Sequence, residues 1–257
     1  MPVALACQEA PDSSSSVEGA GGALGRSWIL GAVAFGGVAL IPLDEPIRDW
    51  IQAGARQESS TLRTGARWIT PLGSAGPLLA STVIYGIGRA IGEEELASAG
   101  LHTAEGIAGT AVVVTVMKGL IRRRRPFVMP HNSRAFFEGS IMKSDSTHES
   151  FPSGHTALAF ALAAAASEEM YLHWPRKRVV VGRLLYGAAT AVGVARMYDD
   201  RHWASDVVVG AAVGTFVSRT VVRWANASKP GSVLGSISGV AFFPGVPPTV
   251  AFRVTTQ

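Results

Sequence analysis

Two short polar stretches in an otherwise apolar chain carry residue types that bind anions and move protons. In "KGLIRRRRP", Lys118 stands seven residues before Arg125, which is followed by a proline. In "FPSGHT", His155 stands just before the uncharged run "ALAFALAAAA". Lysine and arginine bind phosphate-like anions, and histidine is the side chain that most readily exchanges a proton near neutral pH. The two stretches therefore suggest chemistry on an anion.

A third stretch, "ARMYDDRHWASD", adds a second histidine and a carboxylate. It contains Arg196, His202 and Asp206, with the last two residues four positions apart. Residues at this spacing can lie one turn apart on one face of a helix, so that the carboxylate can hold one ring nitrogen of the histidine. Such a pair suits nucleophilic or acid–base catalysis.

The "FPSGHT" stretch also has the local signals of a helix start. Pro152 suits a first helical turn, Ser153 can cap it, and Gly154 lets another group approach the backbone closely. The N–H groups of such a start have no intrahelical partner and can bind an anion. On this stretch alone, an ordinary capped helix accounts for the same residues, so the rest of the chain has to decide.

Six apolar segments predict an all-α fold, a six-helix bundle. Hydrophobic residues make up 47% of the 257 residues and charged residues only 16%, against ~25% charged in a typical soluble domain. The first two segments carry no charge and approach the ~20 residues that span a bilayer, so we expect a multi-pass transmembrane bundle. The segments are residues 28–43, 69–88, 101–120, 155–172, 179–195 and 207–222.

The order of these segments brings the polar stretches together. If each segment crosses the bundle once, the end of the third helix, the start of the fourth and the end of the fifth lie on the same side. Three cationic side chains, two histidines and one carboxylate then converge on one pocket. This convergence favours an active site over three unrelated helix ends.

Taken together, the three stretches resemble the three-part signature of the type 2 phosphatidic acid phosphatase (PAP2) superfamily, which includes class A bacterial acid phosphatases and vanadium haloperoxidases. Each part alone is weak, but all three in order and with the right spacing are specific. The resemblance covers roughly residues 27–225, and Ala195 stands where the family usually has a serine. The matching patterns are Lys118-x6-Arg125-Pro126, Pro152-Ser153-Gly154-His155 and Arg196-x5-His202-x3-Asp206.

The resemblance assigns phosphate binding to five of these residues. Lys118, Arg125 and Arg196 would supply the positive charge that a phosphoryl group in transfer requires. Ser153 and the Gly154 N–H would add donors at the helix start. The mechanism that the family implies uses no metal and no cofactor, and vanadate is expected as an inhibitor.

The resemblance assigns the reacting roles to the remaining three residues. His202 would be the nucleophile and form a phosphohistidine intermediate, with Asp206 holding its other ring nitrogen. His155 would protonate the leaving group and later activate water.

The function expected on these grounds is hydrolysis of lipid phosphates, of the phosphatidic acid, phosphatidylglycerol phosphate or undecaprenyl diphosphate class. Two alternatives stay open: a soluble periplasmic non-specific acid phosphatase, which would act on small phosphate esters, and a vanadium-dependent haloperoxidase. The basic segment "WPRKR" lies opposite the predicted active site, which favours a bacterial cell membrane location with the site facing the periplasm. Four further arginines on the other side oppose this orientation: Arg48, Arg56, Arg63 and Arg67.

The remaining segments and charges receive simpler interpretations. Residues 1–26 are expected to be a flexible lead, with "ALA" as a possible remnant of a secretory signal; residues 27–225 the phosphatase domain; and residues 226–257 an extension with a β-hairpin. Residues 44–68 predict an amphipathic surface helix. The only cysteine, Cys7, excludes an intramolecular disulfide. No nucleic-acid partner is expected. Trp203 is interpreted as a packing residue. Three arginines and three histidines are predicted to be solvated: Arg122, Arg123, Arg124, His131, His148 and His173.

Overall fold

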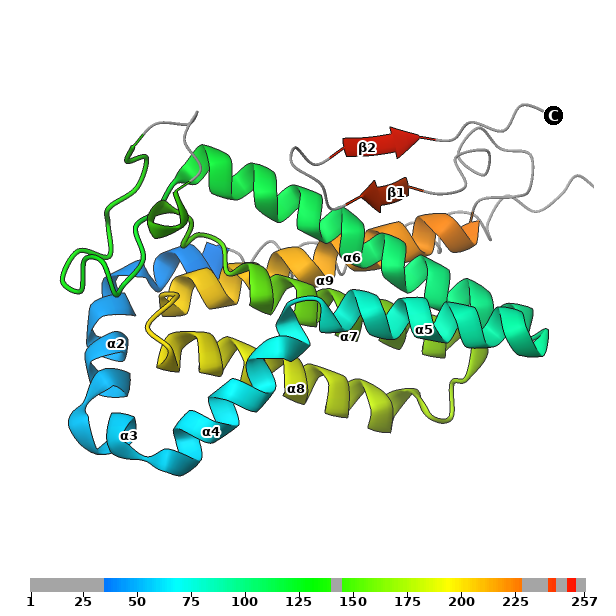
Figure 1. Cartoon of the computed structure of the whole chain (residues 1–257), viewed down its shortest axis with the longest axis horizontal. Helices are drawn as coiled ribbons and strands as arrows, with labels where there is room; N and C mark the ends of the chain where they lie inside the picture. Colours follow the sequence, from blue (N-terminus) through cyan, green and yellow to red (C-terminus); the bar gives the residue numbers. More distant parts are fainter. Residues whose placement is uncertain (1–34, 140–144, 228–239, 244–248, 253–257) are drawn as a thin grey trace, which may run out of the picture.

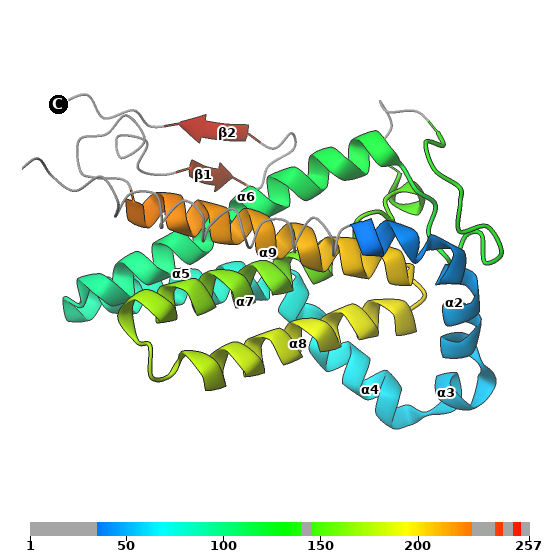
Figure 2. The same ribbon diagram turned by 180° about the vertical axis from the view of Figure 1, so that it is seen from behind.

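The computed structural model describes residues 35–139, 145–227, 240–243 and 249–252, so the predicted lead of residues 1–26 lies outside the described residues. Long helices lie side by side and form the bundle (Figure 1). Seen from behind, the same helices enclose a central one, α7 (Figure 2). The long helices are α5 (Gly76–Ile91), α6 (Glu94–Ile121), α7 (Gly154–His173), α8 (Arg178–Tyr198) and α9 (Ala204–Ala227). The all-α fold class is confirmed.

Helix α7 is the centre of the bundle because its side chains are small. It packs against α9, α8 and α6, and its alanines 157, 161, 163, 164 and 165 are almost fully buried. Gly210 and Gly214 of α9 face its first turns, and a Cβ at Gly210 would lie 2.6 Å from the carbonyl oxygen of Ser153. Small residues let the two backbones approach directly, as they do in membrane bundles.

The linker after the first apolar segment forms an elbow of three short helices rather than one. These are α2 (Asp44–Gln52), α3 (Gly54–Glu58) and α4 (Ser60–Ile69), which follow a 3₁₀ turn at Ile41–Leu43. In Figure 1 the elbow lies at one end of the bundle, and α4 runs beside α8. Ser59 caps α4 by accepting a hydrogen bond from the N–H of Leu62. The predicted amphipathic segment is therefore helical, but broken twice.

Predicted helix boundaries differ from the structure in several places. The third segment, expected over residues 101–120, is α6, which begins seven residues earlier, at Glu94. The first segment, residues 28–43, is described only from residue 35 onward, as helix over residues 35–39 and as the 3₁₀ turn over Ile41–Leu43. The second was expected to begin at residue 69, but α5 begins at Gly76 after a 3₁₀ turn over Thr70–Gly73. The turn is fixed by packing, because a Cβ at Gly73 would lie 2.5 Å from the carbonyl oxygen of His155.

The bundle has the lengths and composition of membrane-spanning helices. Among the described residues, α6, α8 and α9 are each long and apolar enough to cross a bilayer. Exposed aliphatic side chains recur every four residues along α5 and α6, so each helix presents an outer apolar stripe. The stripes are Leu79, Val83, Ile87 and Ile91 on α5 and Val112, Val116 and Leu120 on α6.

The carboxylates inside α7 are paired at the end of the bundle away from the predicted site. Glu168 accepts hydrogen bonds from Arg219 at 3.2 Å and Arg223 at 2.7 Å. Glu169 is 2% exposed and contacts His102 and the Asn226 amide. Charge in an apolar helix is thus tolerated because each carboxylate has partners on neighbouring helices.

The C-terminal extension contains two antiparallel strands, as its sequence predicts. They are β1 (Val240–Phe243) and β2 (Thr249–Phe252), with Val240 opposite Phe252 and Phe243 opposite Thr249. The apolar blocks on either side of "PGVPP" supply the two strands.

We predict that Gly214→Ala destabilises the protein by about 1–3 kcal/mol through overpacking, because the new Cβ would overlap the carbonyl oxygen of Ala157. Gly187→Ala in α8 is the matched control, since nothing lies within 4 Å of its Cβ position. Denaturant unfolding of both variants in detergent measures the difference. Equal stability of the two variants would contradict the close α7–α9 contact.

Candidate active site

The chain segment after α6 carries four arginines, and their side chains alternate between two faces. Arg122 ends the helix in the left-handed conformation, with φ 43°. Arg122 and Arg124 both donate to Glu138, to its carbonyl and its carboxylate respectively. Arg123 and Arg125 point the other way, into the site. An extended chain alternates its side chains in this manner, so one basic run serves two purposes.

Backbone hydrogen bonds hold this segment between two parts of the following loop. The N–H of Arg124 donates to the carbonyl of Ala135 at 2.9 Å, and the N–H of Arg125 to that of Thr147 at 3.0 Å. The N–H of Ser150 in turn donates to the carbonyl of Arg123 at 3.0 Å. The loop therefore places the arginines and the approach to α7 together.

The predicted cations lie close to one another, as the count of helix directions requires. Lys118 in the last turn of α6 and Arg125 in the loop both donate to the carbonyl oxygen of Glu149. Arg196, near the end of α8, is 8% exposed and donates to Asp199 at 3.2 Å. The charges of Lys118, Arg125 and Arg196 all act on His155.

Two of these cations keep an unused donor in the site. The Nε atoms of Arg125 and Arg196 are buried and have no hydrogen-bond partner among the described residues. Burial lowers the pKa of Arg125, and the nearby charge of Arg201 adds to this effect. A guanidinium stays charged despite such shifts. Buried, charged and unpaired donors are the arrangement that an anion completes.

The start of α7 supplies the third side of the site. Ser153 stands at the N-cap position and is fully buried, but its hydroxyl pairs with the Thr156 hydroxyl at 2.9 Å rather than with the backbone. The Ser153 N–H donates to the carbonyl of Asp206 at 3.0 Å, which joins the starts of α7 and α9. A Cβ at Gly154 would lie 3.5 Å from Cε of Lys118. The lysine therefore packs against the helix start.

His202 lies in the turn between α8 and α9 with one ring nitrogen fixed. It is 3% exposed, and its Nδ1 lies 2.7 Å from the carbonyl oxygen of Ser150. A carbonyl oxygen only accepts, so Nδ1 carries the proton and Nε2 keeps its lone pair. Burial lowers the pKa of His202 from 6.5 to about 3, against the opposing effect of Asp206. The ring is therefore neutral near pH 7.

Asp206 supports this histidine mainly through other groups. Its Oδ2 lies 3.7 Å from Nδ1 of His202, within ion-pair distance but farther than the Ser150 carbonyl. The same oxygen accepts from the Ser150 hydroxyl at 2.5 Å and from the Trp203 N–H at 2.9 Å. The Asp206 carboxylate thus holds Ser150, and the Ser150 carbonyl in turn holds the His202 ring. The direct contact between Asp206 and His202 that the sequence predicts is present, at 3.7 Å, but the hydrogen bond from His202 to the Ser150 carbonyl is shorter.

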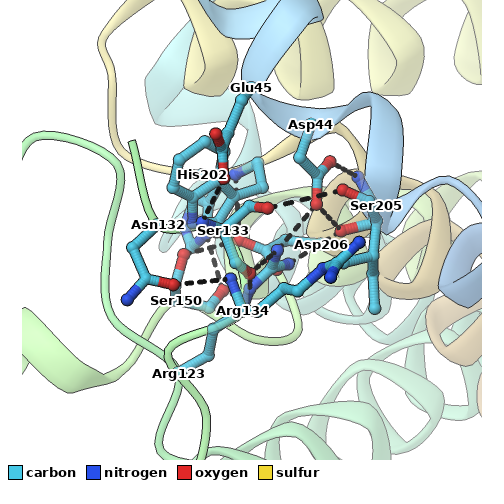
Figure 3. Close-up of polar contacts among 12 residues, drawn as sticks. Asp44, Glu45, Arg123, Asn132, Ser133, Arg134, Ser150, His202, Ser205 and Asp206 are labelled. Atoms are coloured by element: carbon cyan, nitrogen blue, oxygen red, sulfur yellow. Dashed lines mark hydrogen bonds and ion pairs between the residues drawn. The ribbon is translucent and has the colours of Figure 1, made fainter. Parts of the chain in front are cut away.

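The sequence did not identify three further residues of this network, which Figure 3 shows with Asp206 and His202. Arg123 donates to Asp206 at 2.5 Å and to Asp44 at 2.6 Å. Ser205 donates to Asp44 through both its N–H and its hydroxyl. The side chains of consecutive arginines before a proline alternate between two faces, and this pattern could have indicated that Arg123 points into the protein. No pattern distinguished Asp44 within its amphipathic segment.

Some residues predicted to be solvated are not. Arg122 and Arg123 are 4% and 0% exposed, and Arg124 is partly buried, because the loop folds back over them. His148 is 9% exposed and contacts Asp145, whereas His131 is exposed and His173 half-buried. The prediction of a solvated side chain was wrong for Arg122, Arg123 and His148, because a carboxylate or a carbonyl oxygen offsets the cost of burying each of them.

Trp203 packs as expected, at 1% exposure, and its Nε1 also donates to the carbonyl of Arg124 at 3.1 Å. Among the described residues, no group of three or more histidine, cysteine, aspartate or glutamate side chains is placed to hold a metal ion.

Comparison with known proteins identifies the family of the chain. The family model described as PAP2 superfamily matches residues 99–230, which begin in α6 and include α7, α8 and α9. Lipid A 1-phosphatase of Porphyromonas gingivalis is 38% identical over 86 residues, which are 34% of this chain and 18% of that protein. The match thus spans about a fifth of the relative's length.

Two solved structures have a similar fold. A transmembrane PAP2 type phosphatidylglycerolphosphate phosphatase from Bacillus subtilis aligns with a TM-score of 0.59 and 23% identity over 79% of this chain and 96% of its own. LpxE of Aquifex aeolicus aligns with a TM-score of 0.50 and 21% identity over 70% and 95%. Because the family model covers just over half of the sequence, and the fold agrees with it, the chain belongs to the PAP2 superfamily.

Proposed function

We propose that the protein is a membrane phosphatase that hydrolyses lipid phosphates through a phosphohistidine intermediate. One observation carries this proposal: three cations, two of them with unused Nε donors, act on His155. Two of the three, Lys118 and Arg125, also act on the buried neutral His202, whose Nδ1 is already bonded. The free lone pair on Nε2 of His202 is the nucleophile that such a site needs. The cations would bind the phosphoryl oxygens and their developing charge.

In the first step, Nε2 of His202 forms a bond to phosphorus as the bond from phosphorus to the leaving oxygen breaks. His155 gives its proton to that oxygen. Burial lowers the pKa of His155 to about 4, and the charges of Arg196, Lys118 and Arg125 add to this effect. A bound phosphate dianion offsets those charges, so substrate binding itself favours the protonated ring.

In the second step, His155 takes a proton from water, and the water oxygen attacks phosphorus. The bond between phosphorus and Nε2 breaks, inorganic phosphate leaves, and His202 returns to its neutral form. Nδ1 keeps its proton throughout and donates it to the Ser150 carbonyl, so the ring keeps one tautomer for both steps.

The substrate class follows from the surroundings of the site. The exposed apolar stripes on α5 and α6 and the three candidate spans favour a bundle within lipid over a soluble periplasmic acid phosphatase. The Porphyromonas gingivalis relative is named for lipid A and the Bacillus subtilis structure for phosphatidylglycerolphosphate. We therefore propose a phosphorylated lipid whose phosphate reaches the site from the membrane interface.

We predict that His202→Ala abolishes turnover but leaves phosphate and vanadate binding largely in place, because Lys118, Arg125 and Arg196 remain. His155→Ala should reduce hydrolysis of p-nitrophenyl phosphate much less than that of a lipid phosphate, since nitrophenolate leaves without a proton. Steady-state rates on both substrates measure the difference, and rapid quench should trap acid-labile phosphate on the wild type but not on His202→Ala.

Vanadate separates the phosphatase from the alternative chemistry. Turnover of p-nitrophenyl phosphate that vanadate inhibits supports the proposal, whereas vanadate-dependent oxidation of halide would replace it with a haloperoxidase. Near wild-type turnover by His202→Ala would exclude a phosphohistidine at this residue.

We also predict that the active-site end faces the periplasm. His131, in the loop before α7, and Lys177, in the turn after it, are both exposed and lie at opposite ends of this helix. In a Cys7→Ser background, His131→Cys should react with an impermeant maleimide in intact cells, and Lys177→Cys only after permeabilisation. The reverse pattern would place the site in the cytoplasm.

A pH dependence follows from the burial of His202. Its pKa is about 3 in the folded protein against an ordinary value of 6.5, so between these values the unfolded chain binds a proton that the native ring does not. The wild type should therefore lose stability as pH falls from 6.5 toward 4. Its stability advantage over His202→Asn should shrink over this range in denaturant unfolding. Parallel pH curves would mean that the native ring protonates normally.

A further inference from the structure

Asp44, the first residue of α2, is a fully buried carboxylate whose side-chain hydrogen bonds among the described residues go to Arg123 and Ser205. Its Oδ2 accepts from Nη2 of Arg123 at 2.6 Å and from the Ser205 hydroxyl at 2.6 Å. Its Oδ1 accepts from the Ser205 N–H at 2.9 Å. The residue lies outside the span that the family model matches, residues 99–230.

From Asp44 a continuous path of hydrogen bonds leads to the proposed nucleophile (Figure 3). Nη1 of Arg123 donates to Oδ1 of Asp206 at 2.5 Å. The Ser150 hydroxyl donates to Oδ2 of Asp206 at 2.5 Å, and the Ser150 carbonyl receives the Nδ1 proton of His202 at 2.7 Å. The path therefore connects Asp44 to the carbonyl that holds the Nδ1 proton.

The path also has an electrostatic effect. Two carboxylates, Asp44 and Asp206, flank the single Arg123 guanidinium, so the buried group has one net negative charge. When Nε2 of His202 bonds to phosphorus, the ring gains positive charge. A negative charge held close by in a buried site stabilises that charge.

Helix α2 also packs beside His202. Asp44, Ile47 and Ile51 line a void of about 10 Å³ together with His202 and Trp203, at the lower limit for one water molecule. A second contact anchors the helix independently: Arg48 donates to both carboxylate oxygens of Asp200 at 2.8 and 2.7 Å. Docking of α2 and support of the network can therefore be tested separately.

We propose that Asp44 is a positioning residue for the His202 nucleophile: it holds Arg123 and, through Asp206 and Ser150, keeps the ring in the reactive tautomer. It touches neither substrate nor phosphoryl group. The inference rests on the proposed phosphohistidine function.

The test compares Asp44→Asn with Asp200→Asn in the full chain, using p-nitrophenyl phosphate as the probe. The asparagine at position 44 keeps the shape but removes the charge. Asp200→Asn weakens the second anchor of α2, and asparagine tolerates the left-handed backbone there, with φ 55°. Asp44→Asn should lower kcat and the rate of phosphoenzyme formation about 10–100-fold, as loss of a partner behind a functional histidine does. KM should change less than about threefold, because the phosphate-binding cations remain.

Asp200→Asn should keep kcat within about twofold of the wild type if docking alone is not the cause. A kcat for Asp44→Asn within twofold of the wild type would overturn the inference, as would an equal loss in Asp200→Asn. If Asp44→Asn does not fold, Ser205→Ala removes a hydroxyl shared by Asp44 and Arg123. Full kcat in that variant would also overturn the inference, and a loss in kcat alone would support it. A wild type without turnover or phosphoenzyme would instead refute the proposed function.

Discussion

The guanidinium of Arg123, held between two buried carboxylates, is the interaction on which the active-site end depends. Asp44 comes from α2 and Asp206 from α9, and the arginine itself comes from the loop after α6. Removing the arginine would leave two buried carboxylates without their counter-charge, which costs several kcal/mol. The three segments must therefore be in place together before the site has its geometry.

Two arginines of the same run, Arg123 and Arg125, differ in how many of their hydrogen-bond donors have partners. Arg123 donates to two carboxylates, a hydroxyl and the Ser133 carbonyl, so its capacity is used within the protein. Arg125, two residues later, keeps a buried Nε without a partner among the described residues. Protein groups satisfy the first arginine, whereas the second keeps a donor that the proposed phosphate ligand would use. This division separates support of the histidine from binding of the anion.

The sequence predicted the helices and the convergence of the polar stretches because both depend on local pattern and chain direction. Lys118, Arg125, His155, Arg196 and His202 come together as the alternation of helices required. The burial of Arg123 and the part played by Asp44 could not be predicted, because they depend on contacts 79 residues apart in the chain. The break between α4 and α5 was missed for a similar reason, since Gly73 fits against the backbone of α7. Local pattern does not encode such docking.

The glycines of α9 have a consequence for the depth of the site. Gly210 faces the carbonyl of Ser153, and Gly214 faces that of Ala157. Sliding α9 along α7 by one residue would push a Cβ into one of these carbonyl oxygens. The two helices therefore have one allowed register. This register sets the position of Asp206 along the helix axis relative to His155. The spacing between His155 and His202, the proposed proton donor and nucleophile, therefore depends on two residues without a Cβ, Gly210 and Gly214, which lie one helical turn or more beyond Asp206.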